Sequence, residues 1–254
     1  KRWLIDPDGR SLQGLILIRD PHARSLKEGD KVVFELVADP DGDLLGEGAV
    51  TEILGAAGRP DVETAAVIAA HGLRTTFPDE VTEAARRAAS SFDRWREEVP
   101  DDREDLTGMV IFTIDPPDAR DFDDAISISH DPEAGEWTLG VHIADVATFV
   151  VSGGAMDEEA SARGNSVYLP RRVIPMLPEI LSNGVCSLQE GVNRFCKSAF
   201  ITFDERGNVV GQRFSATVIR SRKRLTYLEA QALIDDDPAE ARKHMRSETA
   251  CPAE

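Results

Sequence analysis

The sequence feature that most constrains the fold is a run of aspartates enclosed by strand-like segments. Five of the ten residues from Asp115 to Asp124 are aspartate, and apolar residues precede and follow the run. Solubility does not require acids to crowd beside segments that a protein buries. At neutral pH the carboxylates repel one another, and protons or a bound cation must relieve that repulsion. The run therefore predicts a divalent-metal site.

The spacing of the acids requires the chain to fold back if they share one ion. Mg²⁺ takes oxygen ligands at about 2.1 Å, whereas an extended chain from Asp115 to Asp121 spans roughly 20 Å. The two prolines and the aspartate at 116–118 favour the turn that this reversal needs. In an extended segment Asp123 shares a face with Asp121, and Asp124 lies on the other face. Either the backbone bends between Asp121 and Asp124, or the acids have different functions and do not all bind the same ion.

Other metal and phosphate sites do not fit the pattern. Counted from Asp115, an EF-hand calcium loop needs glycine where Arg120 stands and glutamate where Ile126 stands. The zinc-protease motif, the glycine-rich phosphate loops and the Gly-x-Ser-x-Gly elbow do not occur in the sequence. The chemistry that still fits the aspartate run is hydrolysis or phosphoryl transfer assisted by Mg²⁺ or Mn²⁺. An acidic turn that binds no ion is the alternative.

Size and composition predict a soluble protein of one large or two modest domains. The chain has 254 residues, and 41% hydrophobic residues suffice for an ordinary packed core. No apolar stretch reaches the roughly 20 residues of a membrane helix, and the first residues show no signal-peptide pattern. We therefore expect a cytoplasmic protein with no membrane partner. Cys186, Cys196 and Cys251 lack metal-site spacing, so we expect reduced thiols.

Charge leaves the partner undecided. A net charge of −17 argues against nucleic-acid binding, which depends on Lys and Arg releasing counterions from phosphates. Basic residues nevertheless cluster at Arg163, at Arg171 and Arg172, and between Arg220 and Arg224. Such local stripes could follow a phosphate backbone, or they could pair with the acidic surface.

Residues 1–57 are predicted to form a small antiparallel β-barrel. The expected strands and turns lie at 3–5, 7–9 (turn), 15–18, 32–37, 39–42 (turn) and 49–54. An oligonucleotide-binding barrel is one candidate, although any small antiparallel barrel gives this pattern. Residues 58–105 are expected to form a linker, with at most a strand or a helical turn before Pro78, and then a connecting helix that ends at Pro100.

Residues 106–254 are predicted to form a second domain of the α+β class, with a largely antiparallel or mixed sheet. The expected elements are strands at 109–114, 125–129 and 137–143, a helix at 156–163, and a hairpin of 197–203 with 209–219. The prolines at 170, 175 and 178 exclude a regular helix or sheet interior between the helix and the hairpin.

The aspartate run, Thr113–Ala125, closely resembles the catalytic signature of the RNB domain in the ribonuclease II / ribonuclease R family of exoribonucleases. Other stretches match that family in the same order: Val141–Val146, Asn165–Pro170, Val173–Leu188 and Arg224–Tyr227. The resemblance covers roughly residues 106 to 230. Residues 1–55 resemble, less specifically, the cold-shock-type barrel that precedes this domain in the family.

The resemblance implies a processive hydrolase that degrades single-stranded RNA from its 3′ end and releases nucleoside 5′-monophosphates. By position, Asp115, Asp121 and Asp124 would hold Mg²⁺, with Mn²⁺ as a substitute, and Asp123 would be the acid most critical to hydrolysis. The division of roles among these four acids stays open. Tyr168 matches the family position whose ring packs against the 3′-terminal nucleotide, and such stacking tolerates any base. His142, beside Asp145, is expected to be a satisfied buried histidine rather than half of a catalytic pair.

Family catalytic domains continue beyond the equivalent of Glu254. The continuation supplies an arginine at the scissile phosphate, an aromatic that completes the base clamp and another RNA-binding barrel. We therefore expect this chain to be a fragment, incomplete at its C-terminus, that is nearly inactive without the missing part of the same protein. No obligate protein partner is inferred. Two alternatives are an RNA-binding or regulatory protein with a disabled RNB domain, and a magnesium-dependent phosphohydrolase of small phosphoesters.

Overall fold

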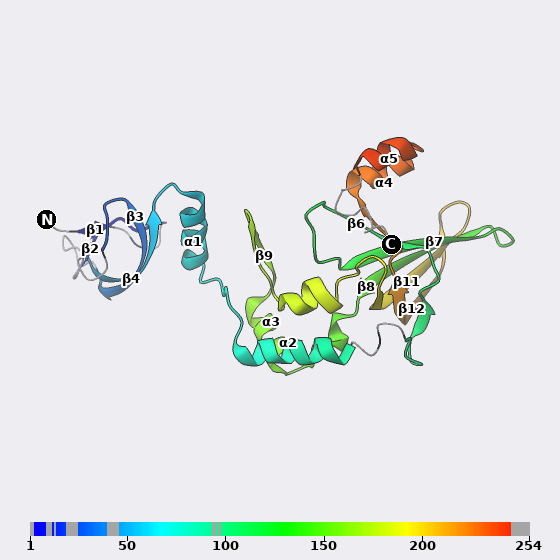
Figure 1. The fold of residues 1–254 in the computed structure, drawn as a ribbon, viewed down its shortest axis with the longest axis horizontal. Helices are drawn as coiled ribbons and strands as arrows, with labels where there is room; N and C mark the ends of the chain where they lie inside the picture. The colour runs from blue at the N-terminus through cyan, green and yellow to red at the C-terminus, as the bar shows by residue number, and fades with distance from the viewer. Residues whose placement is uncertain are drawn as a thin grey trace. The chain divides into compact units, whose positions relative to one another are not determined.

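A computed structural model describes residues 3–8, 12, 14–18, 25–39, 46–92, 95 and 98–244 (Figure 1). Contacts divide the chain into two compact units. Unit 1 comprises Lys1–Thr75 with Val167–Ile174, and unit 2 comprises Thr76–Ser166 with Pro175–Glu254. The domain limits expected from the sequence, at 57 and 105, stay a prediction. The predicted turn at 39–42 lies, apart from Asp39, outside the described residues, as do Gly9 and Cys251.

Unit 1 contains a four-stranded sheet in the order β1-β2-β4-β3. Its strands are β1 (Leu4–Ile5), β2 (Ile16–Ile18), β3 (Asp30–Ala38) and β4 (Gly46–Ala56). All four lie where the sequence predicts strands. The β1/β2 and β3/β4 pairs are antiparallel, and β2 runs parallel to β4. Ile5, Ile16 and Ile18 form the buried centre of this sheet.

Unit 1 also holds two elements that the sequence pattern did not show. Helix α1 (Pro60–Ala70) occupies the predicted linker and packs on β3 and β4. It begins with proline at its first turn, where the missing N–H costs nothing. The strands β9 (Val167–Leu169) and β10 (Arg172–Ile174) form a short hairpin that turns at Pro170 and Arg171, with a left-handed φ of 63° at Arg171.

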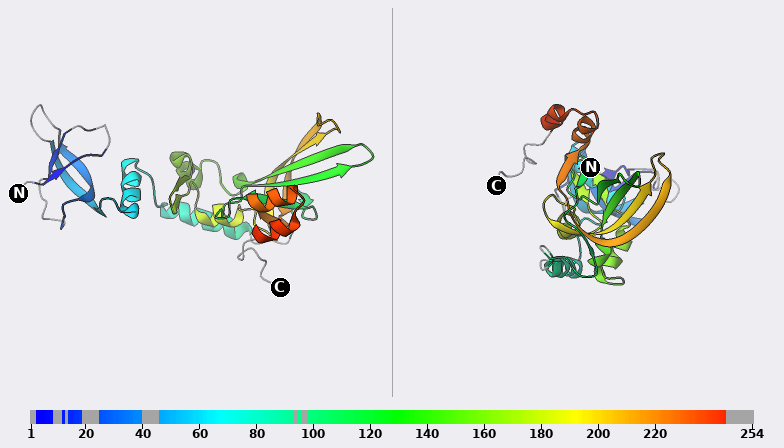
Figure 2. Two further views of the ribbon diagram at one scale, coloured as in Figure 1. Left: turned by 90° about the horizontal axis from the view of Figure 1, so that it is seen from above. Right: turned by 90° about the vertical axis from the view of Figure 1, so that its right-hand side faces the viewer.

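Unit 2 is built on a seven-stranded mixed sheet in the order β13-β6-β7-β8-β11-β12-β5, which curls strongly (Figure 2). The strands are β5 (Glu104–Leu106), β6 (Ile111–Asp115), β7 (Asp124–Asp131), β8 (Glu136–Ala144), β11 (Asn193–Phe203), β12 (Val209–Arg220) and β13 (Lys223–Thr226). The four central pairs are antiparallel, and the outer pairs β13/β6 and β12/β5 are parallel. The α+β class and the mixed sheet are thus confirmed.

Helices cover part of this sheet and close the core of unit 2. They are α2 (Asp79–Phe92), η2 (Val146–Thr148), α3 (Ala155–Arg163), the π-helical η3 (Ile180–Val185), α4 (Tyr227–Ile234) and α5 (Pro238–His244). Helix α2 packs against α3 and η3. Its buried Phe92 meets the rings of Phe149 and Phe195 edge-on, with centroids 5.5 and 4.9 Å away. Among the described helices, none is both long and apolar enough to cross a membrane.

The thiols of Cys186 and Cys196 are buried and free, as the sequence predicts. Burial raises the pKa of Cys186 to about 12 and that of Cys196 still further, so both thiols stay protonated and unreactive at neutral pH.

His142 on β8 is a satisfied core histidine, which confirms the expectation. Its Nε2 lies 2.9 Å from the Ser127 hydroxyl on β7, and its Nδ1 lies 2.7 Å from the Ser198 hydroxyl on β11. The Ser198 hydroxyl is also hydrogen-bonded to the Thr217 hydroxyl on β12, at 2.7 Å. Burial lowers the pKa of His142 to about 4, so the ring is neutral at physiological pH.

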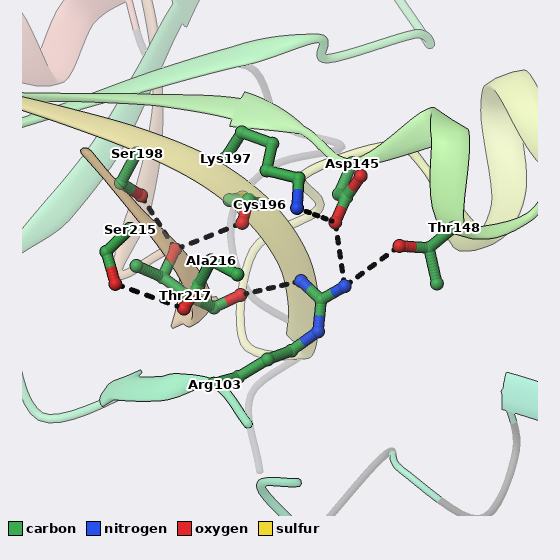
Figure 3. A network of polar contacts seen from close by, with 9 residues as sticks. All are labelled: Arg103, Asp145, Thr148, Cys196, Lys197, Ser198, Ser215, Ala216 and Thr217. Atoms are coloured by element: carbon green, nitrogen blue, oxygen red, sulfur yellow. Dashed lines mark hydrogen bonds and ion pairs between the residues drawn. The ribbon is translucent and has the colours of Figure 1, made fainter. Parts of the chain in front are cut away.

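Asp145 belongs to a different network, shown in Figure 3. Arg103 Nη2 donates to Asp145 Oδ2 at 2.7 Å and to the Thr148 hydroxyl at 2.8 Å, while Lys197 Nζ lies 3.5 Å from the same carboxylate. Burial alone would raise the pKa of Asp145, but these donors hold it below its ordinary value. The pair is therefore structural: it ties the start of β5 to the segment after β8.

We expect Gly140→Ala to destabilise unit 2. Gly140 is buried on β8, and an added Cβ would lie 2.3 Å from Ser127 Oγ and 2.9 Å from His142 Nε2. Such overpacking typically costs about 1–3 kcal/mol of unfolding free energy, measurable by urea unfolding. Gly211→Ala on β12 is the matched control, because its Cβ would meet Thr202 at an ordinary 3.7 Å. Equal stability of the two variants would contradict the steric argument.

Candidate metal centre

Two neighbouring strands fix the ends of the aspartate run. Strand β6 ends at Asp115 and its antiparallel neighbour β7 begins at Asp124, with Ile111 opposite Ser127. The segment 115–124, named here the acidic loop, must therefore reverse the chain between adjacent strands. Ala119 N–H donates to the Pro116 carbonyl at 3.1 Å, which closes a β-turn. The predicted reversal is confirmed.

Asp115 is half-buried at the start of the acidic loop. Burial raises the pKa of its carboxyl, and the charges of Asp124 and Asp121 add to the shift. The Thr113 hydroxyl and the Arg224 guanidinium act in the opposite direction. The net rise shows that the fold disfavours the charged form of Asp115.

Asp123 is in the same situation, although more of its surface is exposed. The protein around it partly desolvates the carboxyl and raises its pKa, and Asp121, Asp124 and Asp115 raise it further by repulsion. The four acids that the sequence singled out therefore share one electrostatic environment. A cation placed among them would relieve both the burial penalty and the repulsion.

The donor set fits a hard divalent ion, but the ligands do not form a finished coordination shell. Asp115 Oδ2 is buried without a hydrogen-bond partner, and so is Thr113 Oγ1, whose geometry toward Asp115 is not that of an ordinary hydrogen bond. Carboxylate oxygens are the ligands that Mg²⁺ and Mn²⁺ prefer. Within the described parts of the chain, however, no three acidic, histidine or cysteine side chains gather closely enough to hold an ion. The ligand roles of Asp115, Asp121 and Asp124 stay predictions.

Ser187 holds the second half of the acidic loop. Its hydroxyl donates to the Arg120 carbonyl at 2.9 Å and accepts from Phe122 N–H at 3.2 Å. Leu188 N–H also donates to the Phe122 carbonyl at 2.9 Å. The Phe122 ring is 6% exposed and belongs to the core of unit 2. Our sequence reading did not single out Ser187, because a serine carries no charge pattern or periodicity.

Arg224 holds the first half of the loop. Strand β13 runs parallel to β6 and pairs Arg224 with Thr113. From there the Nη2 atom of Arg224 donates to carbonyls of the turn, those of Pro116 (3.3 Å), Pro117 (3.1 Å) and Ala119 (3.1 Å).

Two more of the basic residues that the sequence singled out bind protein acceptors. Arg163 pairs with Glu159 at 2.9 Å, and Arg220 donates to Asn193 Oδ1 at 3.0 Å. Arg163 thus pairs with an acidic residue, one of the two roles that the sequence left open, and contact of the basic residues with phosphate stays a prediction.

Tyr168 lies opposite Val173 in the β9/β10 hairpin, and its side chain is 66% exposed. The hairpin belongs to unit 1, whereas the acidic loop belongs to unit 2. Contact with RNA stays a prediction for this residue.

Comparisons with known proteins agree with the resemblance. The family model of the RNB domain matches residues 103–251, and that of the cold shock domain matches residues 5–78. Ribonuclease R of Acidithiobacillus ferrooxidans is 43% identical over 213 residues, which cover 82% of this chain and 46% of that protein. Ribonuclease R of Thermotoga maritima is 42% identical over 212 residues, covering 83% and 29%. The chain thus spans less than half the length of these relatives.

Solved structures show the same fold. Mycoplasma genitalium RNase R in complex with double-stranded RNA matches with a TM-score of 0.77 and 28% identity, over 90% of this chain and 41% of that one. The same protein in complex with ribose-methylated single-stranded RNA matches with a TM-score of 0.78 and 26% identity, over 95% of this chain and 40% of that one. Yeast Ssd1, described as a pseudonuclease, shares the fold at 18% identity and a TM-score of 0.64, over 92% and 30%.

We expect Asp123→Asn to stabilise the fold when no divalent ion is added. A carboxyl with a raised pKa holds its proton more tightly in the folded than in the unfolded chain, so the wild type loses stability as pH rises above 3.8 through the raised value. Asparagine removes this loss, and the gain should stay below about 1 kcal/mol because solvent screens the charges. Urea unfolding in chelator should show the gain at pH 8 and not near pH 4. A gain that is independent of pH would contradict the repulsion argument.

Proposed function

We propose that this chain, which belongs to the RNB-domain family of ribonucleases, forms the metal-binding part of a processive exoribonuclease. The enzyme would shorten single-stranded RNA from the 3′ end and release nucleoside 5′-monophosphates. The observation that carries the proposal is the acidic loop, where four mutually repelling carboxylates are held between two sheet strands. A protein that only needs to bind RNA gains nothing from such a cluster, which repels phosphate.

In this proposal Asp115, Asp121 and Asp124 would hold Mg²⁺ or Mn²⁺. The bound ion would polarise the scissile phosphate and lower the pKa of the attacking water. Asp123 would orient that water and accept its proton.

Single-stranded RNA is the proposed partner. The Mycoplasma genitalium RNase R of similar fold is described in complex with RNA, both double-stranded and ribose-methylated single-stranded. A cold-shock domain, matched at residues 5–78, is of a fold that binds single strands by stacking and backbone charge. We further propose that the rest of a longer protein completes the enzyme and that it works in the cytoplasm.

A binding protein with a disabled RNB domain is the second candidate, because yeast Ssd1, a pseudonuclease, shares the fold. Fold alone does not decide between the two. The presence of Asp115, Asp121, Asp123 and Asp124 favours hydrolysis. A phosphohydrolase of small phosphoesters would have no use for the cold-shock domain.

The proposal predicts stepwise shortening of 5′-labelled single-stranded RNA by the full-length product of the gene that encodes this chain, in the presence of Mg²⁺. Asp123→Asn should lower the rate by about 10²–10⁴-fold and leave RNA affinity largely intact, because a proton acceptor is lost and shape is kept. Asp118→Asn is the matched control: Asp118 is an exposed acid of the same loop. RNA binding without shortening would instead support the second candidate, and turnover of small phosphoesters alone would contradict both.

For Tyr168→Ala we expect a weaker grip on short RNA and a longer final product, because base stacking on an aromatic ring contributes about 1–3 kcal/mol per base. Gel analysis of the end product measures this length. Tyr227→Ala removes the other tyrosine of the chain, which is 60% exposed on α4, and should leave the product length unchanged. An unaltered product length in Tyr168→Ala would count against the stacking role.

A further inference from the structure

Two arginines on one short segment bind the backbone at the two ends of β6. Arg222 donates to carbonyls of the turn that precedes β6, those of Thr107 (3.2 Å), Gly108 (3.3 Å) and Met109 (3.4 Å). Arg224 donates to the carbonyls of the turn that follows β6. The two guanidinium groups thus both donate hydrogen bonds to backbone carbonyls, at opposite ends of one strand. Only the Arg224 end carries the acidic loop.

We infer that Arg224 is a positioning residue for the proposed metal centre, holding the acidic loop folded back so that Asp115 stays near Asp121, Asp123 and Asp124. The inference rests on the proposed function for its consequence. In this scheme Arg224 acts through the backbone carbonyls of the turn.

The turn needs an external donor because of its composition. Pro116 and Pro117 have no N–H, so the turn itself supplies few donors to its own carbonyls. The Ala119 N–H closes the one turn bond, to the Pro116 carbonyl. The Arg224 guanidinium satisfies the Pro117 and Ala119 carbonyls from outside and adds a second bond at Pro116. Without it, the carbonyls of the exposed Pro116 and Pro117 would bond to water, and the turn would lose its side-chain link to β13.

Electrostatics adds to the need for a clamp. Four carboxylates in one environment push the loop apart. A guanidinium bound to the carbonyls of the turn opposes that push. The clamp would therefore matter most before a cation is bound, when nothing else offsets the repulsion.

Arg224 is itself anchored. Its guanidinium carbon lies 4.5 Å from the centre of the Phe122 ring, which is buried in the core. Its backbone N–H donates to Glu190 Oε2 at 3.0 Å. The clamp is thus fixed to the sheet at one end and to the core at the other.

The Ser187 contacts form an independent second clamp on the same loop. The Ser187 carbonyl accepts from Nε of the buried Arg194 at 2.7 Å, and Arg194 also donates to the Gly184 carbonyl at 3.2 Å. Arg224 therefore secures the turn at 116–119, and Ser187 secures 120–122. Loss of either should loosen the carboxylates without removing any of them.

The test measures Mn²⁺ binding directly, by water-proton relaxation, on the full-length product of the gene. Arg224→Lys keeps the charge, but its nitrogen lies one bond closer to the backbone than the Nη2 atom that makes all three contacts, and it has no planar group to lie over the Phe122 ring. Arg224→Ala removes both the charge and the contacts. We expect the Mn²⁺ dissociation constant to rise about 10–100-fold in both variants, the usual effect of losing a group that orients metal ligands. Arg222→Ala is the matched control and should bind Mn²⁺ as the wild type does. Asp115→Asn locates the signal at the acidic loop and should abolish it.

Each outcome separates the inference from the function on which it rests. Absence of Mn²⁺ binding in the wild type would overturn the proposed metal centre, and the inference with it. Wild-type affinity in Arg224→Lys and Arg224→Ala, with binding lost in Asp115→Asn, would overturn the inference alone. An equal loss in Arg222→Ala would also overturn it, because any anchor of β6 would then suffice. If circular dichroism shows that Arg224→Ala does not fold, Arg224→Lys and Ser187→Ala decide, and both must weaken Mn²⁺ binding while folded.

Discussion

The repulsion among four carboxylates is the constraint around which unit 2 is organised. Asp115 and Asp123 sit where burial and neighbouring charge both disfavour ionisation, in the connection between the antiparallel strands β6 and β7. Two side chains hold the backbone of this loop by hydrogen bonds to its carbonyls. Arg224 binds the first half of the loop, and Ser187 binds the second half. Metal centres are commonly supported in this way, by residues behind the ligands.

Much of this organisation could be predicted from local sequence. The strands β6, β7 and β8 and the β11/β12 hairpin lie within a few residues of their expected limits, because their apolar alternation is strong and turn residues bound them. The reversal at Pro116 followed from its two prolines. The buried state of His142 followed from its place in an apolar strand.

What could not be predicted depends on long-range pairing. Arg224 stands 108 residues after Pro116, and its role appears only once β13 is placed beside β6. Ser187 lies 67 residues from Arg120 and carries no charge to suggest a function. Helix α1 was taken for a linker because its alanine-rich sequence has a weak apolar stripe, with Val62 and Ile68 as its buried residues. A convergent ligand set was also expected for the acids, and the described residues do not show one.

The row of polar side chains through the sheet has a consequence for how accurately the acids are placed. The row comes from four neighbouring strands of the sheet and consists of Ser127, His142, Ser198 and Thr217. These side chains can form their hydrogen bonds only if each strand pairs with the next in the observed register. A slip of one residue anywhere would leave a desolvated hydroxyl or imidazole facing hydrocarbon, with no partner. The row therefore penalises a sheet whose strands pair in the wrong register. It lies on the same strands, β7 and β8, that place Asp124, so correct pairing of these strands also fixes the position of that acid.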